Sequence, residues 1–194
     1  FSLEEKETIL FKKLNFEIES GDFISIVGRS GSWKTTLLNM IAWLVDFNSW
    51  ELTVDNIKYV WMTQDNLTKF RGKNMSFIFQ QFHLIPNLTV RENIELPIDI
   101  NWIKSRFTSD EILDKVWLID KADSYPFNLS WGEQQRVAIA RAFIGDTSIL
   151  MADEPTGNLD EKNAENIMEL LKSLHTETNN TVILITHDKT VANY

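Results

Sequence analysis

Short apolar runs alternate with longer stretches of helical periodicity along this chain. Runs rich in β-branched and apolar residues predict strands at 22–27, 51–55, 76–80, 148–153 and 181–186. A repeat of apolar residues every three or four positions predicts helices at 34–44, 132–144 and 161–175, and several helical stretches within 88–118 that Pro97 interrupts. Strands that alternate with helices in this order indicate an α/β fold with a mainly parallel sheet.

The length and charge of the chain narrow the possible classes of protein. With 194 residues, of which 43% are apolar, the chain is long enough for one globular domain. Its 19 basic and 28 acidic residues give a net charge of −9, which argues against nucleic acid as the main partner, because such binders usually carry a basic face. No cysteine is present, and no apolar run approaches the roughly 18 residues of a membrane span. The acidic start does not resemble a signal peptide, and without an initial Met we expect a fragment truncated at both ends.

The segment 28–36, GRSGSWKTT, resembles a phosphate-binding loop of the pattern G-x-x-x-x-G-K-[ST], except that Trp33 stands where a glycine is expected. A predicted strand leads into it and a predicted helix follows, which is the context that such a loop requires. Its backbone N–H groups would converge on the β- and γ-phosphates of a nucleotide. Lys34 would add a full positive charge, and Thr35 would offer its hydroxyl to Mg²⁺. The alternative is a strand–helix turn with a chance lysine.

Two acidic residues follow the apolar run at 148–153. Asp153 is placed to hold Mg²⁺, directly or through water. Glu154 lies one residue further, where a carboxylate can orient or deprotonate an attacking water. The alternative is a pair of acids that merely ends a strand.

The segment 129–136, LSWGEQQR, leads into the strongest predicted helix. Ser130 and the backbone around Gly132 would form a second anion-binding helix N-terminus. An ordinary N-cap, with Ser130 as the capping residue, explains the same pattern equally well.

Taken together, these motifs resemble the ATP-binding subunit of ABC transporters over essentially the whole chain. Three further motifs occur in the order of that family: IFQ with Gln80, GNLD ending in Asp160, and ITHD with His187. The stretches FIFQQFHLIPNLTVRENIELP and DEPTGNLD resemble the subgroup that acts in lipoprotein release and macrolide export.

The resemblance implies a P-loop NTPase fold of the ABC ATPase type, a single domain over 1–194 with an inserted helical subdomain at roughly 85–130. It implies ATP and Mg²⁺ as ligands. The implied catalytic residues are Glu154, His187 and Gln80, and the implied Mg²⁺ ligands are Thr35, Gln80 and Asp153. The implied nucleotide-binding residues are Phe1, Gly28, Ser30, Gly31, Ser32, Trp33, Lys34, Thr35, Thr36, Ser130, Gly132 and Asp160. Phe1 would stack on adenine, unless it is simply a terminal residue without a role.

The resemblance also implies partners and a location. Two copies of the chain would sandwich two ATP molecules head to tail, with the phosphate loop of one copy facing the LSWGE segment of the other. The homodimer would bind a permease at the cytoplasmic face of the membrane and power efflux or lipoprotein release. The same ATPase could instead drive a membrane complex in cell division or cell-wall regulation, and a hydrolysis-deficient nucleotide-binding subunit is a third alternative.

The tryptophans form a pattern of their own. Glycine makes up 7 of 194 residues, half of the usual roughly 7%, and tryptophan also occurs 7 times. The family has glycine where this chain has Trp33, Trp43, Trp50, Trp117 and Trp131, and weaker alignments add Trp61 and Trp102. We hypothesise that these residues are encoded by UGA, which some bacteria read as glycine and another genetic code reads as tryptophan. The alternative is a degenerate or engineered ATPase in which Trp33 obstructs the phosphates.

Overall fold

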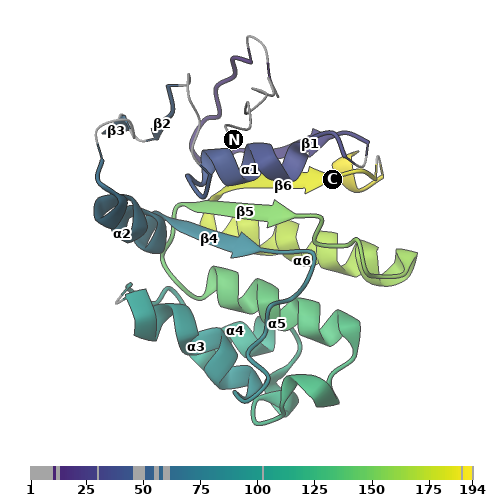
Figure 1. Ribbon diagram of the computed structural model, residues 1–194. Coiled ribbons are helices and arrows are strands. Elements are labelled where there is room, and N and C mark those ends of the chain that lie inside the picture. The colour runs from purple at the N-terminus through teal and green to yellow at the C-terminus, as the bar shows by residue number, and fades with distance from the viewer. Residues whose placement is uncertain are drawn as a thin grey trace, which may run out of the picture.

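A parallel β-sheet lies at the centre of the computed structural model, which describes residues 11, 14–29, 31–45, 51–54, 57–58, 62–101, 103–188 and 190–193 (Figure 1). The sheet order is β1-β6-β5-β4, and each neighbouring pair is parallel. The strands span Phe23–Val27 (β1), Met75–Ile78 (β4), Ile149–Asp153 (β5) and Thr181–Thr186 (β6). The predicted α/β fold is therefore confirmed.

Helices cover both faces of this sheet. They span Lys34–Ile41 (α1), Trp131–Phe143 (α5) and Glu161–Thr178 (α6). Alternate strand residues point to opposite faces. Leu150 and Leu184 belong to the apolar cluster that includes α5 and α6, whereas Met151 and Ile183 belong to the cluster that includes α1. The sheet thus has one core on each side, and the carboxyl ends of its strands form one edge.

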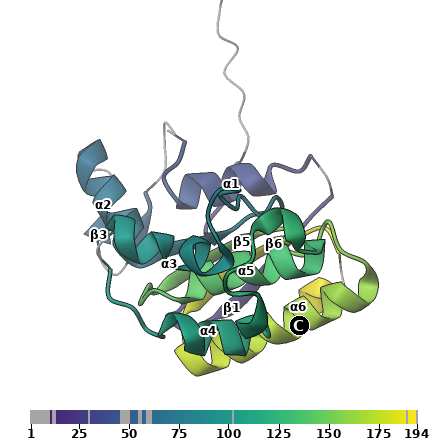
Figure 2. The same ribbon diagram turned by 90° about the horizontal axis from the view of Figure 1, so that it is seen from below.

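A helical segment lies between β4 and α5 along the chain; it is below the sheet in Figure 1 and is seen from below in Figure 2. It comprises the helices Val90–Asn101 (α3) and Ser109–Lys115 (α4) and the 3₁₀ turns Ile119–Lys121 (η2) and Pro126–Asn128 (η3). The prediction that Pro97 interrupts a helix was wrong, because α3 continues through it. Proline removes one backbone donor from a helix. Here Ile94, which is fully buried, and Ile98 hold the helix against the main core.

The remaining elements are small. The strands Thr53–Val54 (β2) and Ile57–Lys58 (β3) form an antiparallel pair, and Val191–Asn193 (η4) is a 3₁₀ turn. The helix Gln64–Asn74 (α2) was not predicted, because its sequence is largely polar and only Leu67 is buried. The Thr63 side chain caps α2 by accepting a hydrogen bond from the Asn66 N–H, at 3.4 Å.

Candidate nucleotide site

The loop between β1 and α1 turns tightly at the carboxyl edge of the sheet. The Gly28 N–H donates to the carbonyl oxygen of Thr186, at 3.4 Å. A Cβ atom at Gly28 would lie 2.6 Å from the Ser32 Oγ, so a larger residue would push this side chain away. Gly31 has a φ of +76°, a conformation that favours glycine. The loop therefore folds back on itself and presents its backbone toward the start of α1.

Lys34 is the first residue of α1 and fills the centre of this loop. Its side chain is only 8% exposed, and its ammonium donates to the carbonyl oxygens of Gly28, at 2.8 Å, and Arg29, at 3.0 Å. The Nζ atom also lies 3.9 Å from Glu154 Oε1. A buried ammonium donor at a helix N-terminus is suited to binding an anion.

Thr35 and Asp153 meet across the gap between α1 and β5. The Thr35 Oγ1 donates to Asp153 Oδ1 at 3.2 Å. Burial raises the pKa of Asp153 above its usual value, and the neighbouring Glu154 charge raises it further. These oxygens are the hard ligands that Mg²⁺ prefers, and a cation would offset the cost of burying the carboxylate.

Glu154 and His187 form a pair at the ends of β5 and β6. The His187 Nδ1 lies 2.9 Å from Glu154 Oε2. Glu154 leaves the strand with a φ of +46°, and its N–H donates to the Ile185 carbonyl oxygen at 2.8 Å. The carboxylate is thereby fixed between a lysine and a histidine.

A cavity of about 570 Å³ brings most of the predicted residues together. It is lined by Gly31, Ser32, Trp33, Lys34, Thr35, Thr36, Gln80, Asp153, Glu154 and His187. This volume falls within the usual range of small-molecule sites. Gly28, Ser130, Gly132 and Asp160, which we also predicted, do not line it. Phe1 and Ser30, which we also predicted, lie outside the described residues, as do Trp50, Trp61 and Trp102.

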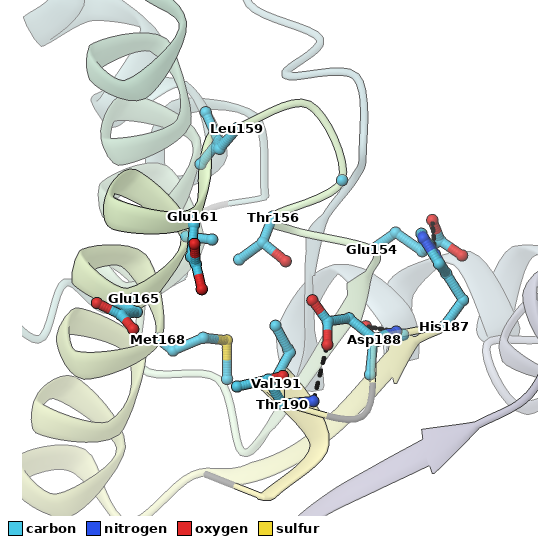
Figure 3. Close-up of a pocket in the computed structure, with 13 residues that line it drawn as sticks. Glu154, Thr156, Leu159, Glu161, Glu165, Met168, His187, Asp188, Thr190 and Val191 are labelled. Atoms are coloured by element: carbon cyan, nitrogen blue, oxygen red, sulfur yellow. Dashed lines mark hydrogen bonds and ion pairs between the residues drawn. The ribbon is translucent and has the colours of Figure 1, made fainter.

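A second cavity, of about 340 Å³, adjoins the first and shares Glu154 and His187 with it (Figure 3). Its other walls come from α6, including Glu161 and Met168, and from the segments after β5 and β6, including Thr156 and Asp188. The Glu154–His187 pair therefore separates the phosphate-loop side from a chamber against α6.

The LSWGE segment forms the start of α5. The Ser130 Oγ accepts from the Glu133 N–H at 3.3 Å, and the Ser130 N–H donates to Glu133 Oε2 at 2.8 Å, which completes a capping box. The Ser130 Oγ also donates to Glu133 Oε2, at 2.7 Å, and the two hydrogen bonds that the carboxylate accepts lower the pKa of Glu133. The ordinary N-cap function of Ser130 is thus present. The predicted anion-binding role of Ser130 and Gly132 remains a prediction.

Asp160 likewise caps the next helix, α6. Its carboxylate accepts from the Asn163 N–H at 3.0 Å and from Asn163 Nδ2 at 2.6 Å, which lowers the pKa of Asp160. A contact of Asp160 across a dimer also remains a prediction.

Sequence reasoning missed the side chains that hold the segment after β4. Arg141, on α5, donates to the carbonyl oxygens of Phe82 and His83, each at 2.7 Å. The Asn158 Nδ2 donates to the Gln80 carbonyl oxygen at 2.7 Å. An arginine within the largely apolar stretch of α5 was the available signal for the first contact. Both contacts fix Gln80 relative to the cavity.

None of the helices in the described part of the chain is long and apolar enough to cross a membrane. In the same part of the chain, three or more His, Asp or Glu side chains nowhere form a cluster that could hold a metal ion.

Comparisons with known proteins agree with this site. Residues 11–157 match the ABC transporter family. An uncharacterised ABC transporter ATP-binding protein, MJ0796 of Methanocaldococcus jannaschii, is 43% identical over 100% of this chain and 86% of its own length. Its dimeric structure in a post-hydrolysis state, bound to ADP and Pi, has a TM-score of 0.84, with 42% identity over 99% of this chain and 86% of that chain.

Two relatives with named activities extend the match. The lipoprotein-releasing system ATP-binding protein LolD of Buchnera aphidicola is 40% identical over 94% of this chain and 81% of its own length. The macrolide export ATP-binding/permease protein MacB of Aggregatibacter actinomycetemcomitans is 40% identical over 99% of this chain but only 30% of its own length. With its phosphate loop, its parallel sheet and these relatives, the chain belongs to the ABC transporter family as an ATP-binding subunit with ATPase activity.

Proposed function

We propose that this chain hydrolyses Mg²⁺–ATP in a homodimer that powers a membrane permease for efflux or lipoprotein release. The observation that carries the proposal is the convergence of Lys34, Asp153, Glu154 and His187 on one cavity of about 570 Å³. Dimerisation is supported by the dimeric, ADP- and Pi-bound state of MJ0796. The lipoprotein-releasing and macrolide-export relatives support the transport role.

The phosphate loop supplies the binding contacts of the proposed reaction. In this proposal, backbone N–H groups at the N-terminus of α1 face the phosphates, and the Lys34 ammonium exchanges its two carbonyl contacts for phosphate oxygens. Phe1 stacks on adenine in this proposal.

Thr35, Asp153 and Gln80 are the proposed Mg²⁺ ligands. Such a site needs only one or two carboxylates because the nucleotide phosphates and water complete the shell. When bound, Mg²⁺ neutralises charge on the phosphates. In the chain itself, the Thr35 hydroxyl and the Asp153 carboxylate already lie 3.2 Å apart, which positions two oxygen ligands on one side of the cavity.

Glu154 is the proposed catalytic base. Its carboxylate is anchored by the His187 contact at 2.9 Å, which leaves the group oriented toward the cavity where a water would attack the γ-phosphate. His187 then contacts the γ-phosphate, and Ser130, Gly132 and Asp160 act from the other subunit.

The test of hydrolysis is Glu154→Gln, made in a protein with glycine at positions 33 and 131. We expect ATP binding to persist while kcat falls by about 10²–10³-fold, because the amide cannot accept a proton. The matched control is Glu165→Gln, which changes an exposed acid on the far wall of the second cavity. Equal hydrolysis by the two variants would contradict the assignment of Glu154.

A groove of about 350 Å³ is the proposed permease-binding surface. Its lining is mostly apolar, with Phe77 and Phe79 on one wall and Leu96 and Ile100 from α3 on the other. Arg141 and His83 also line it, so the groove adjoins the segment that positions Gln80. MacB joins an ATP-binding part and a permease in one protein, and this chain matches 30% of it. We therefore propose that the helical subdomain at 85–130 and this groove bind the permease at the cytoplasmic face of the membrane.

Ile100→Glu tests this surface, because Ile100 is 63% exposed in the groove. We expect at least tenfold less of the membrane permease to co-purify with the variant, since an apolar contact of the groove is lost. The ATPase activity of the isolated subunit should not change. Ile57→Glu, on the remote β2–β3 pair and also exposed, is the matched control. Equal recovery of the permease with both variants would place its binding surface elsewhere.

A further inference from the structure

Three tryptophans have a left-handed backbone. Among the described residues, Trp33, Trp43 and Trp117 have φ values of 63°, 53° and 56°. Residues with a Cβ atom pay an energetic cost in this conformation, whereas glycine adopts it freely. For a bulky residue such a φ is a genuine outlier. Tryptophan therefore stands where the backbone favours glycine.

The end of α1 shows why the backbone turns there. Trp43 follows the C-cap residue Ala42, and its N–H donates to the Met40 carbonyl oxygen at 3.0 Å. The N–H of Leu44 donates to the Asn39 carbonyl oxygen at 2.7 Å. This pair of hydrogen bonds is the Schellman motif, in which the left-handed residue after the C-cap is usually glycine.

The end of α4 repeats the same motif. Trp117 follows the C-cap residue Val116, and its N–H donates to the Asp114 carbonyl oxygen at 2.9 Å. The N–H of Leu118 donates to the Leu113 carbonyl oxygen, also at 2.9 Å. Two helices in separate parts of the molecule thus place tryptophan at the same motif position.

Trp33 occupies a comparable position at the start of α1. It is the N-cap residue, with φ 63° and ψ 19°, and its side chain makes no capping hydrogen bond. Its side chain is 51% exposed and lines the nucleotide cavity. An indole here therefore combines an unfavourable backbone with a position in the proposed phosphate site.

The other left-handed residues have different explanations. Asn179 ends α6, and asparagine tolerates this conformation. Histidine is also enriched in it, which accounts for His83. Glu154 carries the carboxylate of the cavity. Trp131 differs from the other three described tryptophans because it lies in the helical first turn of α5.

We infer that positions 33, 43 and 117 are glycine in the protein made by the cells that carry this gene. Reading UGA as glycine in those cells, and as tryptophan in the written sequence, accounts for all three positions. The inference rests on the backbone at each site, and its consequence for position 33 also rests on the proposed function.

Thermal unfolding of Trp117 variants tests the backbone argument. The Trp117 side chain is 62% exposed, so its removal costs little packing. Trp117→Gly should have a Tm about 2–4 °C above that of Trp117→Ala, because alanine retains the left-handed cost. At Trp131, where the backbone is helical, the alanine variant should be at least as stable as the glycine variant. Equal Tm values for the two Trp117 variants would overturn the inference.

Nucleotide titration of Trp33→Gly tests the consequence for the site. We expect affinity for ATP at least tenfold above that of the chain as written. The Tm comparison involves no nucleotide, so the glycine assignment and the proposed phosphate site are tested independently. A Tm difference without a gain in ATP affinity would contradict the proposed phosphate site rather than the glycine assignment.

The residue identity can also be measured directly. Trypsin releases residues 116–121 as one peptide, VWLIDK in the written sequence. Mass spectrometry of the protein from its native cells should find glycine in place of tryptophan. A tryptophan-containing peptide, or UGG codons at positions 33, 43 and 117, would overturn the inference.

Discussion

The two helices proposed to face phosphate, α1 and α5, begin in opposite ways. α1 starts after a left-handed residue, without a side-chain cap, and the ammonium of its first residue, Lys34, lies in the preceding loop. α5 starts with a complete capping box between Ser130 and Glu133. The first N–H groups of a helix have no intrahelical partner and need one from elsewhere.

This difference indicates how the two sites depend on a ligand. At α1 the first backbone N–H groups have no side-chain cap, so they are available to phosphate oxygens, and Lys34 adds a positive charge beside them. At α5 the Ser130 side chain already holds the Glu133 N–H, and Glu133 adds a negative charge. α1 is therefore prepared for an anion within one subunit, whereas the capping box leaves α5 with fewer N–H groups for the anion that we propose it binds across a dimer.

Removing the charge at α1 should have the largest effect. In a protein with glycine at positions 33 and 131, Lys34→Ala should lower kcat/KM for ATP by about 10²–10³-fold, because the phosphates lose a preorganised positive charge. Steady-state ATPase assays measure this loss. The control is Lys58→Ala, which removes an exposed lysine paired with Glu51. Similar activity in both variants would mean that Lys34 and the start of α1 do not bind the phosphates of ATP.

Breaking the cap of α5 should have a moderate effect on stability. Ser130→Ala removes a capping side chain, which typically costs about 1 kcal/mol, or about 2–4 °C in Tm. Thr108→Ala is the matched control because Thr108 and Glu111 form the same capping box on α4. Both should lose similar stability, but only Ser130→Ala should also lower ATPase activity. Unchanged activity in Ser130→Ala would mean that Ser130 is only a cap.

Removing the negative charge at α5 should have a smaller effect. Glu133→Gln keeps an acceptor for the capping box but removes the charge from the helix N-terminus. Such a charge is worth about 0.3–1 kcal/mol, so ATP-dependent dimerisation should strengthen about two- to fivefold. Analytical ultracentrifugation in the presence of ATP measures the dimer dissociation constant. Weaker dimerisation would indicate that Glu133 contacts the partner favourably.

The smallest expected effect is on acid stability. Hydrogen bonds from Ser130 lower the pKa of Glu133 in the folded protein. The ionised Glu133 therefore contributes to the free energy of unfolding above its unfolded-state pKa, and this contribution is lost as pH falls through the folded-state pKa. Between neutral pH and about pH 3, the Tm of Glu133→Gln should therefore fall by less than the Tm of the parent protein. Parallel curves of Tm against pH for the two proteins would contradict the hydrogen bonds between Ser130 and the Glu133 carboxylate.

Much of this site could be predicted because its residues are tied to strand ends. Residues at the carboxyl ends of parallel strands meet at one edge of the sheet. The proximity of Lys34, Asp153 and His187 could therefore be predicted from the sequence. The contacts of Arg141 and Asn158 could not, because both join segments that are far apart in sequence. α2 escaped prediction because its cap, rather than an apolar stripe, marks its start. Pro97 misled us because packing of α3 outweighs one missing donor.

Glu154 shows the opposite side of the glycine argument. Its φ of +46° means that a glycine there would relieve the backbone and should make the fold more stable. The chain instead keeps a side chain in an unfavourable conformation where its carboxylate meets both Lys34 and His187. Selection for stability alone would replace this residue. Its presence therefore indicates that the protein accepts a lower free energy of unfolding in order to keep a carboxylate at this position.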